Sequence, residues 1–200
     1  VFFAIFGGLV PALTSFPDMI IALKMLILVV WVGAGFSKFG KHFSNVIPPM
    51  VSNAPTIPFK AVKRAHYKNF PTDMRPSGVA HFMAHVNGTF VEIAAPLILF
   101  FATNKYLGIA AAAVMIIFHL FIISTFPLAV PLEWNVVFAW ATAFLFLGFP
   151  NWTTTDAAGD DVSYYVFGTT QPAVIALIAV ALLFFPVLGN LRPDKVSFLP

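Results

Sequence analysis

Two histidines, a glycine and a glutamate recur at helical spacing in an otherwise apolar part of the sequence. His81, His85, Gly88 and Glu92 are four, three and four residues apart, which places them on one face of an α-helix. Ionisable side chains within apolar spans are costly to bury and are functional candidates by default. We therefore expect this face to point into protein, with Glu92 hydrogen-bonded to a polar partner.

The same spacing raises the question of a metal site. A His-x-x-x-His pair can present two imidazoles to one metal ion, and Glu92 or Glu133 could add a carboxylate. Interhelical hydrogen bonding is the commoner role of a membrane histidine, and five histidines are too few for the histidine-rich di-iron sites of membrane desaturases and hydroxylases. We predict no metal site, and we interpret His81, Glu92 and Glu133 as a structural or relay cluster.

Lys38, His85 and His119 are the candidates for acid–base chemistry. A lysine held in a partly dry pocket can act as a general base, and the two histidines could relay a proton or orient a substrate. A lysine at a helix end more commonly extends its ammonium to the headgroups, and that alternative stays open. Lys24 lies towards the opposite end of its apolar stretch, where its stem could reach the interface, and we assign it no role.

These residues lie in long apolar stretches that predict membrane-spanning helices. Hydrophobic residues make up 60% of the chain and charged residues 10%, whereas soluble domains are about a quarter charged. A hydrocarbon core about 30 Å thick needs about 20 apolar residues per helix. We predict an all-α polytopic membrane protein, a bundle of about six transmembrane helices. The predicted spans are residues 1–14, 19–37, 77–102, 106–126, 132–149 and 171–189.

The stretch 1–14 is too short to cross a membrane unless it continues upstream. The chain has no initiator Met and no secretory signal. We interpret residues 1–200 as a single transmembrane domain from a longer protein.

The loops predict the orientation. Residues 38–76 contain seven Lys or Arg and one Asp, whereas residues 150–170 contain three Asp and no Lys or Arg. Because cytoplasmic loops are enriched in basic residues, we expect 38–76 to be a cytoplasmic basic loop and 150–170 an outer acidic loop. This predicts a multi-pass protein of a cytoplasmic (inner) membrane.

The charge and the composition also limit the classes of partner that we expect. The net charge of +3 comes from the basic loop, so we predict no nucleic-acid partner. The expected partners are membrane lipids and other subunits of a membrane complex. The absence of cysteine excludes disulfides, thiolate metal sites and a cysteine nucleophile.

Three segments occur in the order expected of a known superfamily. They are Ala34-Gly35-Phe36-Ser37-Lys38-Phe39, then His85-Val86-Asn87-Gly88-Thr89-Phe90-Val91-Glu92, and then the pair Phe118-His119. Together they resemble the vitamin K-dependent gamma-carboxylase superfamily, whose bacterial members are called horizontally transferred transmembrane domain proteins. The resemblance covers residues 20–145, and it implies that Lys38 is a catalytic base or proton-relay residue.

A second resemblance covers most of the chain. It rests on Ser124-Thr125-Phe126-Pro127-Leu128-Ala129-Val130-Pro131-Leu132-Glu133-Trp134-Asn135 and on Arg192-Pro193-Asp194-Lys195-Val196-Ser197-Phe198-Leu199-Pro200. These segments are similar to an uncharacterised family of bacterial, often actinobacterial, transmembrane proteins. That family has no assigned activity.

Three functions fit these observations. The favoured prediction is a membrane subunit or scaffold that binds lipid, quinone or pigment, or that docks onto a larger membrane complex. The 24 phenylalanines and the small-residue run 108–113 suit close helix packing or a flat apolar ligand. The first alternative is a carboxylase-like membrane enzyme acting on a lipidic or quinone-like substrate, with Lys38 as base. The second alternative is a transporter, although the sequence lacks the paired broken helices typical of that class.

Overall fold

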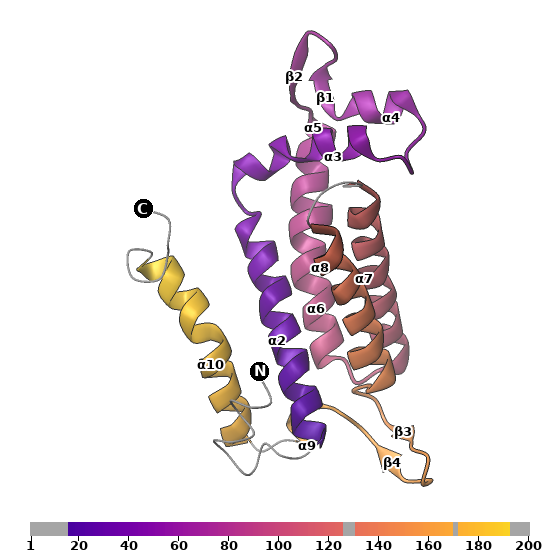
Figure 1. Cartoon of the computed structure of the whole chain (residues 1–200), viewed down its shortest axis with the longest axis vertical. Coiled ribbons are helices and arrows are strands. Elements are labelled where there is room, and N and C mark those ends of the chain that lie inside the picture. Colours follow the sequence, from indigo (N-terminus) through magenta and orange to yellow (C-terminus); the bar gives the residue numbers. More distant parts are fainter. Residues whose placement is uncertain (1–15, 126–130, 170–171, 193–200) are drawn as a thin grey trace.

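A computed structural model describes residues 16–125, 131–169 and 172–192, and these form a mostly helical structure (Figure 1). A continuous column is built from α5 (Gly78–Phe82), the π-helix η3 (Met83–Phe90) and α6 (Val91–Phe101). Beside it lie α2 (Phe16–Ser37) and α7 (Lys105–Thr125). The last two helical columns are α8 (Pro131–Thr142) with the π-helix η4 (Ala143–Gly148), and α10 (Pro172–Leu191).

Five of the predicted spans fall on these columns, with ends that differ by no more than three residues. Three columns are long and apolar enough to cross a membrane: α2, α5 to α6, and α7. The remaining two contain shorter apolar helices, Glu133–Gly148 and Ile175–Gly189. The predicted span 1–14 lies outside the described residues. The total of about six spans therefore stays a prediction.

The all-helix prediction omitted two small hairpins in the connections. One connection contains η2 (Lys41–Asn45), α3 (Ile47–Asn53), α4 (Lys60–Ala65) and the antiparallel pair β1 (Tyr67–Asn69) and β2 (Asp73–Pro76). The other contains β3 (Thr154–Thr155) paired with β4 (Asp161–Val162), followed by α9 (Val166–Thr169). In Figure 1 the first connection lies at the top of the bundle and the second at the bottom. We call the first, within residues 38–76, the basic connection and the second, within residues 150–169, the acidic connection. The two connections lie at opposite ends of the bundle.

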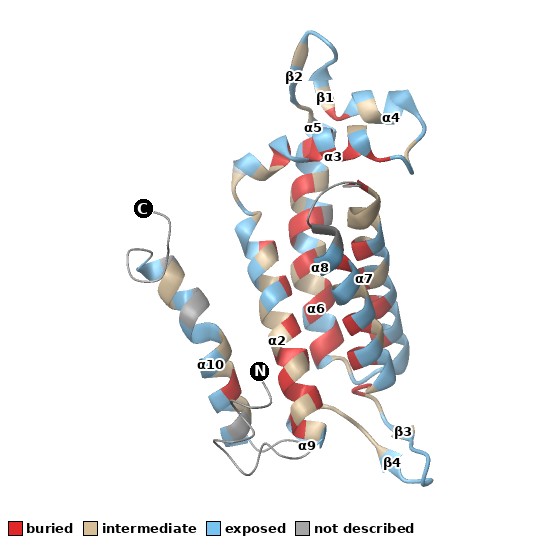
Figure 2. Ribbon diagram, in the orientation of Figure 1, coloured by how far each residue is buried: buried red, intermediate tan, exposed pale blue. Residues whose placement is uncertain are grey.

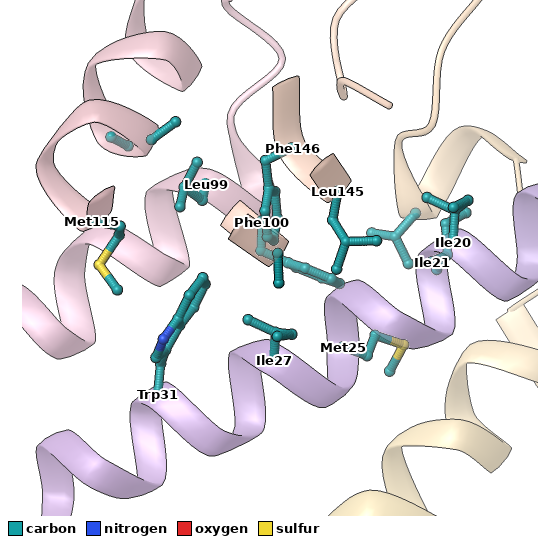
Figure 3. Close-up of a cluster of buried hydrophobic side chains, with 14 of the residues drawn as sticks. Ile20, Ile21, Met25, Ile27, Trp31, Leu99, Phe100, Met115, Leu145 and Phe146 are labelled. Atoms are coloured by element: carbon teal, nitrogen blue, oxygen red, sulfur yellow. The ribbon is translucent and has the colours of Figure 1, made fainter. Parts of the chain in front are cut away.

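The hydrophobic core lies between α2, α6, α7 and η4. Its labelled members, shown in Figure 3, include Trp31 and Met25 of α2, Leu99 of α6, Met115 of α7 and Phe146 of η4. The rings of Trp31 and Phe146 stack with centroids 6.1 Å apart. A buried cluster of this kind fixes how the four elements pack, and each polar group among them needs a partner.

Much of the outer surface of α7, α8 and α10 is exposed (Figure 2), and many of its side chains are apolar. Ile117 of α7, Trp134 of α8 and Val180 of α10 each expose more than half of their surface. Between α2, α6 and α10 an apolar groove of about 780 Å³ is lined by residues that include Leu28, Leu97 and Leu183. Such a surface fits hydrocarbon better than water.

Gly108 of α7 packs directly against Trp152 of the acidic connection. A Cβ at this position would lie 2.3 Å from Cζ3 of Trp152, whereas a Cβ at Gly33 of α2 would meet nothing within 4 Å.

We expect Gly108→Ala to lower the free energy of unfolding by about 1–3 kcal/mol, because the added methyl group must displace the indole of Trp152. Gly33→Ala should leave the stability unchanged or raise it by up to about 1 kcal/mol. Thermal unfolding of both variants in detergent compares them, and equal melting temperatures would contradict this packing.

Candidate functional site

Lys38 forms an ion pair with Glu92, a residue 54 positions later in the chain. Lys38 directly follows the last turn of α2, and Glu92 lies in the first turn of α6. The Lys38 ammonium donates a hydrogen bond to Oε2 of Glu92, and the two side chains are only 17% and 6% exposed. The prediction that Glu92 has a polar partner is confirmed. Because its ammonium is held by a buried carboxylate, Lys38 does not behave as a freely snorkelling lysine.

The Lys38 ammonium also lies against an apolar cavity. It is 5.2 Å from the ring centroid of Phe43 and 6.0 Å from that of Phe118. The cavity measures about 170 Å³ and lies between η2, α3, η3 and α7. Its lining consists of Lys38, Phe43, Val46, Ile47, Met50, Met83, Gly88, Phe118, Phe121 and Ile122. We call it the Lys38 pocket, and Lys38 is the charged residue in its wall.

His119 is buried and uses both ring nitrogens in contacts between helices. Nε2 accepts a hydrogen bond from the indole N–H of Trp31 at 3.1 Å, and Nδ1 lies 2.9 Å from Oδ1 of Asn135. Since Nε2 is an acceptor, the ring proton belongs on Nδ1, which donates to Asn135. The hydrogen bond to Asn135 therefore fixes the tautomer of His119. The ring joins α2, α7 and α8, and it cannot relay a proton without breaking one of these bonds.

Lys24 is the polar residue that sequence reasoning placed wrongly. Instead of reaching the interface, its side chain is buried, with the residue only 1% exposed. Its ammonium donates to Oδ1 of Asn151 at 2.7 Å and to the carbonyl of Tyr164 at 3.2 Å. The Asn151 amide in turn donates to the carbonyls of Leu99 and Phe100, in the last turn of α6, at 2.8 and 3.0 Å. These carbonyls have no partner within their own helix, so Asn151 ties α2 and α6 to the acidic connection.

The three contacts share one face of α2. Lys24, Trp31 and Lys38 are each seven residues apart, so successive members lie about 10 Å apart along the axis and drift by only about 20° around it. Each contacts a different element: Asn151, His119 and Glu92 respectively. The spacing was visible in the sequence, whereas nothing local identified Asn151 or Asn135 as partners.

The π-helix η3 breaks the predicted stripe on the third span. Gly88 and Glu92 are buried, but His85 is half-buried and His81 is exposed. Hydrogen bonds from i to i+5 widen the helix and rotate the residues before η3 relative to those after it. The stripe assumed α-helical spacing throughout, and that assumption was wrong. Thr89 reflects the wider turn, since its hydroxyl donates to the carbonyl of Ala84, five residues earlier, at 3.2 Å.

The remaining candidates do not join the Lys38–Glu92 pair. His81 lines a separate polar pocket with Lys68 and Arg75, and Glu133 is exposed near the start of α8. In the part of the chain that the structure describes, no three His, Asp or Glu side chains lie close enough together to hold a metal ion. The six predicted site residues thus separate into one ion pair, one buried histidine contact and three residues outside both.

Comparison with known protein families identifies a family to which the chain is similar. A family model described as a transmembrane protein of unknown function (DUF3556) matches residues 5–200. No curated protein and no solved structure matches the chain. The match covers both the Lys38 pocket and the Lys24–Asn151 contact.

The buried Lys24–Asn151 contact predicts an asymmetry between its two partners. Asn151→Leu leaves a buried ammonium short of an acceptor and two carbonyls without donors, so we expect it to lower the free energy of unfolding by about 3 kcal/mol or more. Lys24→Met removes the charge and keeps most of the volume, and should cost about 1 kcal/mol. Melting temperatures in detergent test this order. A Lys24→Met variant less stable than Asn151→Leu would refute it.

Proposed function

Since the chain belongs to a family of transmembrane proteins of unknown function, we propose that it binds a lipidic or quinone-like ligand in the Lys38 pocket. The observation that carries this proposal is a charged hydrogen-bond donor, Lys38, in the wall of an apolar cavity. Small-molecule sites combine a mostly apolar lining with a few placed polar groups. The Lys38 pocket has this composition.

The size of the cavity limits how much of a ligand it holds. At about 170 Å³ it is smaller than the roughly 300–1,000 Å³ typical of pockets that enclose a whole ligand. It suits one substituted ring or a short apolar head. Phe43 and Phe118 offer faces on which a flat ring can stack. A longer tail would leave the cavity past Val46, a lining residue that is itself exposed.

Lys38 supplies the polar contact. An ammonium group has several N–H donors, and the ion pair with Glu92 occupies only part of them. The remaining donors can reach a carbonyl or hydroxyl oxygen of the ligand. Because Glu92 compensates the charge, Lys38 can stay in this apolar wall without a bound ligand.

The second candidate is catalysis at the same place. The resemblance to the gamma-carboxylase superfamily implies that Lys38 is a base, and the hydrogen bond to Glu92 gives it a partner to which a proton could pass. His119 is occupied by Trp31 and Asn135, which leaves Glu92 as the candidate relay group. A scaffold that docks onto a larger complex and a transporter remain further alternatives.

Binding is tested with decylubiquinone, titrated by calorimetry onto the purified protein in nanodiscs, with empty nanodiscs subtracted. We expect Ile122→Trp, which fills the cavity, to weaken binding at least about tenfold. Ile117→Trp makes the same change on the lipid-facing side of α7 and is the matched control. Lys38→Gln should also weaken binding about tenfold, the effect of one charged hydrogen bond.

The outcomes separate the candidates. Equal affinity in the Ile122→Trp and Ile117→Trp variants, or no binding by the parent, would falsify the proposal. Lys38→Arg keeps the charge but cannot readily give up its proton. A variant that binds decylubiquinone like the parent, yet loses an activity that the parent shows, would favour catalysis.

We also propose that the basic connection faces the cytoplasm of a bacterial cell and the acidic connection faces outward. The support is the charge asymmetry between connections at opposite ends of the bundle. The chain has no cysteine, so a maleimide labels a single-cysteine variant only at the introduced residue. In intact cells an impermeant maleimide should label Ala157→Cys but label Ala61→Cys only after lysis. The reverse pattern would invert the orientation.

A further inference from the structure

A second pocket lies on the other side of the η2–α3 segment from the Lys38 pocket and shares no lining residue with it. It measures about 300 Å³ and is lined by Ser44, Asn45, Lys68, Arg75, Pro76 and His81. Lys68 lies on β1, Arg75 on β2 and His81 on α5. The pocket thus forms where the hairpin meets the start of the third span, in the connection at the top of Figure 1.

We propose that this pocket binds a phosphate group. Lys and Arg side chains are hydrogen-bond donors only, and histidine, serine and asparagine can all donate. The lining contains no carboxylate. Convergent cationic and neutral donors around one small pocket form a site for an anion that has several acceptor oxygens. The proposal goes beyond the function of the Lys38 pocket.

Asp73 occupies some of the hydrogen-bond donors of Arg75. The Arg75 guanidinium donates to the Asp73 carboxylate from Nε at 2.9 Å and from Nη2 at 2.7 Å. These bonds occupy one edge of the guanidinium fork and leave its other N–H groups for a ligand. The side-chain hydrogen bond from Arg75 lowers the pKa of Asp73 to about 2, so the carboxylate keeps its charge at neutral pH and keeps holding the fork.

The charges leave room for an anion. Lys68 and Arg75 contribute two positive charges and Asp73 one negative charge, which gives a net charge of +1 before His81 is considered. Lys68 is exposed, and its positive charge helps to lower the pKa of the Asp73 carboxyl. A phosphate ester or free phosphate would give Lys68 and Arg75 a further common partner. This differs from a purely topogenic role, because net loop charge alone requires no defined pocket.

A phosphate could come from a lipid headgroup or from a soluble molecule. The surroundings include the exposed rings of Phe70 and Phe82, and Arg64 lies 5.4 Å from the Phe70 ring centroid. Aromatic and basic residues together are typical of the zone at membrane headgroups. The experiment therefore tests both sources separately.

The test uses the purified protein in phosphatidylcholine nanodiscs. One arm adds phosphatidic acid to the nanodiscs and measures its retention by native mass spectrometry, and the other titrates inorganic phosphate by calorimetry. We expect Lys68→Gln to weaken binding about tenfold. Lys60→Gln changes the net charge equally on α4, outside the pocket, and should match the parent. Asp73→Asn should strengthen binding, because it removes a negative charge and releases Arg75 donors.

Each outcome bears on the proposal. Retention of phosphatidic acid without binding of inorganic phosphate assigns the site to a lipid headgroup, and binding of both assigns it to the phosphate group itself. Binding of inorganic phosphate alone assigns it to a soluble ligand. Absence of both, or equal binding by the Lys68→Gln and Lys60→Gln variants, overturns the site. Unchanged binding in Asp73→Asn removes Arg75 from it.

Discussion

The arrangement depends on the need to satisfy three polar side chains on one face of α2. In an apolar environment an unpaired ammonium or indole N–H costs several kcal/mol. Each of these side chains is therefore hydrogen-bonded to a residue from a different part of the chain: Lys24 to Asn151, Trp31 to His119 and Lys38 to Glu92. Apolar packing around Trp31 and Phe146 is non-directional, whereas these three hydrogen bonds each require a defined partner and geometry. They fix α2 relative to α6, α7, α8 and the acidic connection.

The two π-helices lie next to these contacts. Phe146 in η4 stacks on Trp31 and lies 5.4 Å from the Lys24 ammonium. Gly88 in η3 lines the Lys38 pocket, where its missing side chain leaves room for Phe43. π-Helical turns are rare and occur frequently at functional sites. Here the wider turns re-aim side chains, so that Glu92 meets Lys38 while His81 turns away to the hairpin.

The η2–α3 segment separates two pockets of opposite chemistry. On one side Phe43 and Ile47 face an apolar cavity with Lys38 in its wall, and on the other Ser44 and Asn45 face a cationic pocket. Neighbouring residues of one short segment therefore serve both. Such a pair suits a protein that meets both the apolar interior and the charged surface of a membrane. The proposed ligands of the two pockets are independent of each other.

The sequence by itself determined the class of protein and the positions of five long apolar helical columns, because hydropathy and length are local properties of a segment. It also identified Lys38, Glu92 and His119 as costly residues that need partners, since that cost depends on residue type. Which partner each receives was decided by tertiary structure. Asn151 and Asn135 are ordinary polar residues until folding brings them to Lys24 and His119. The sequence also did not predict which side chains of the third span share one face. A π-helical turn depends on the packing around it, and the spacing of its own residues does not reveal it.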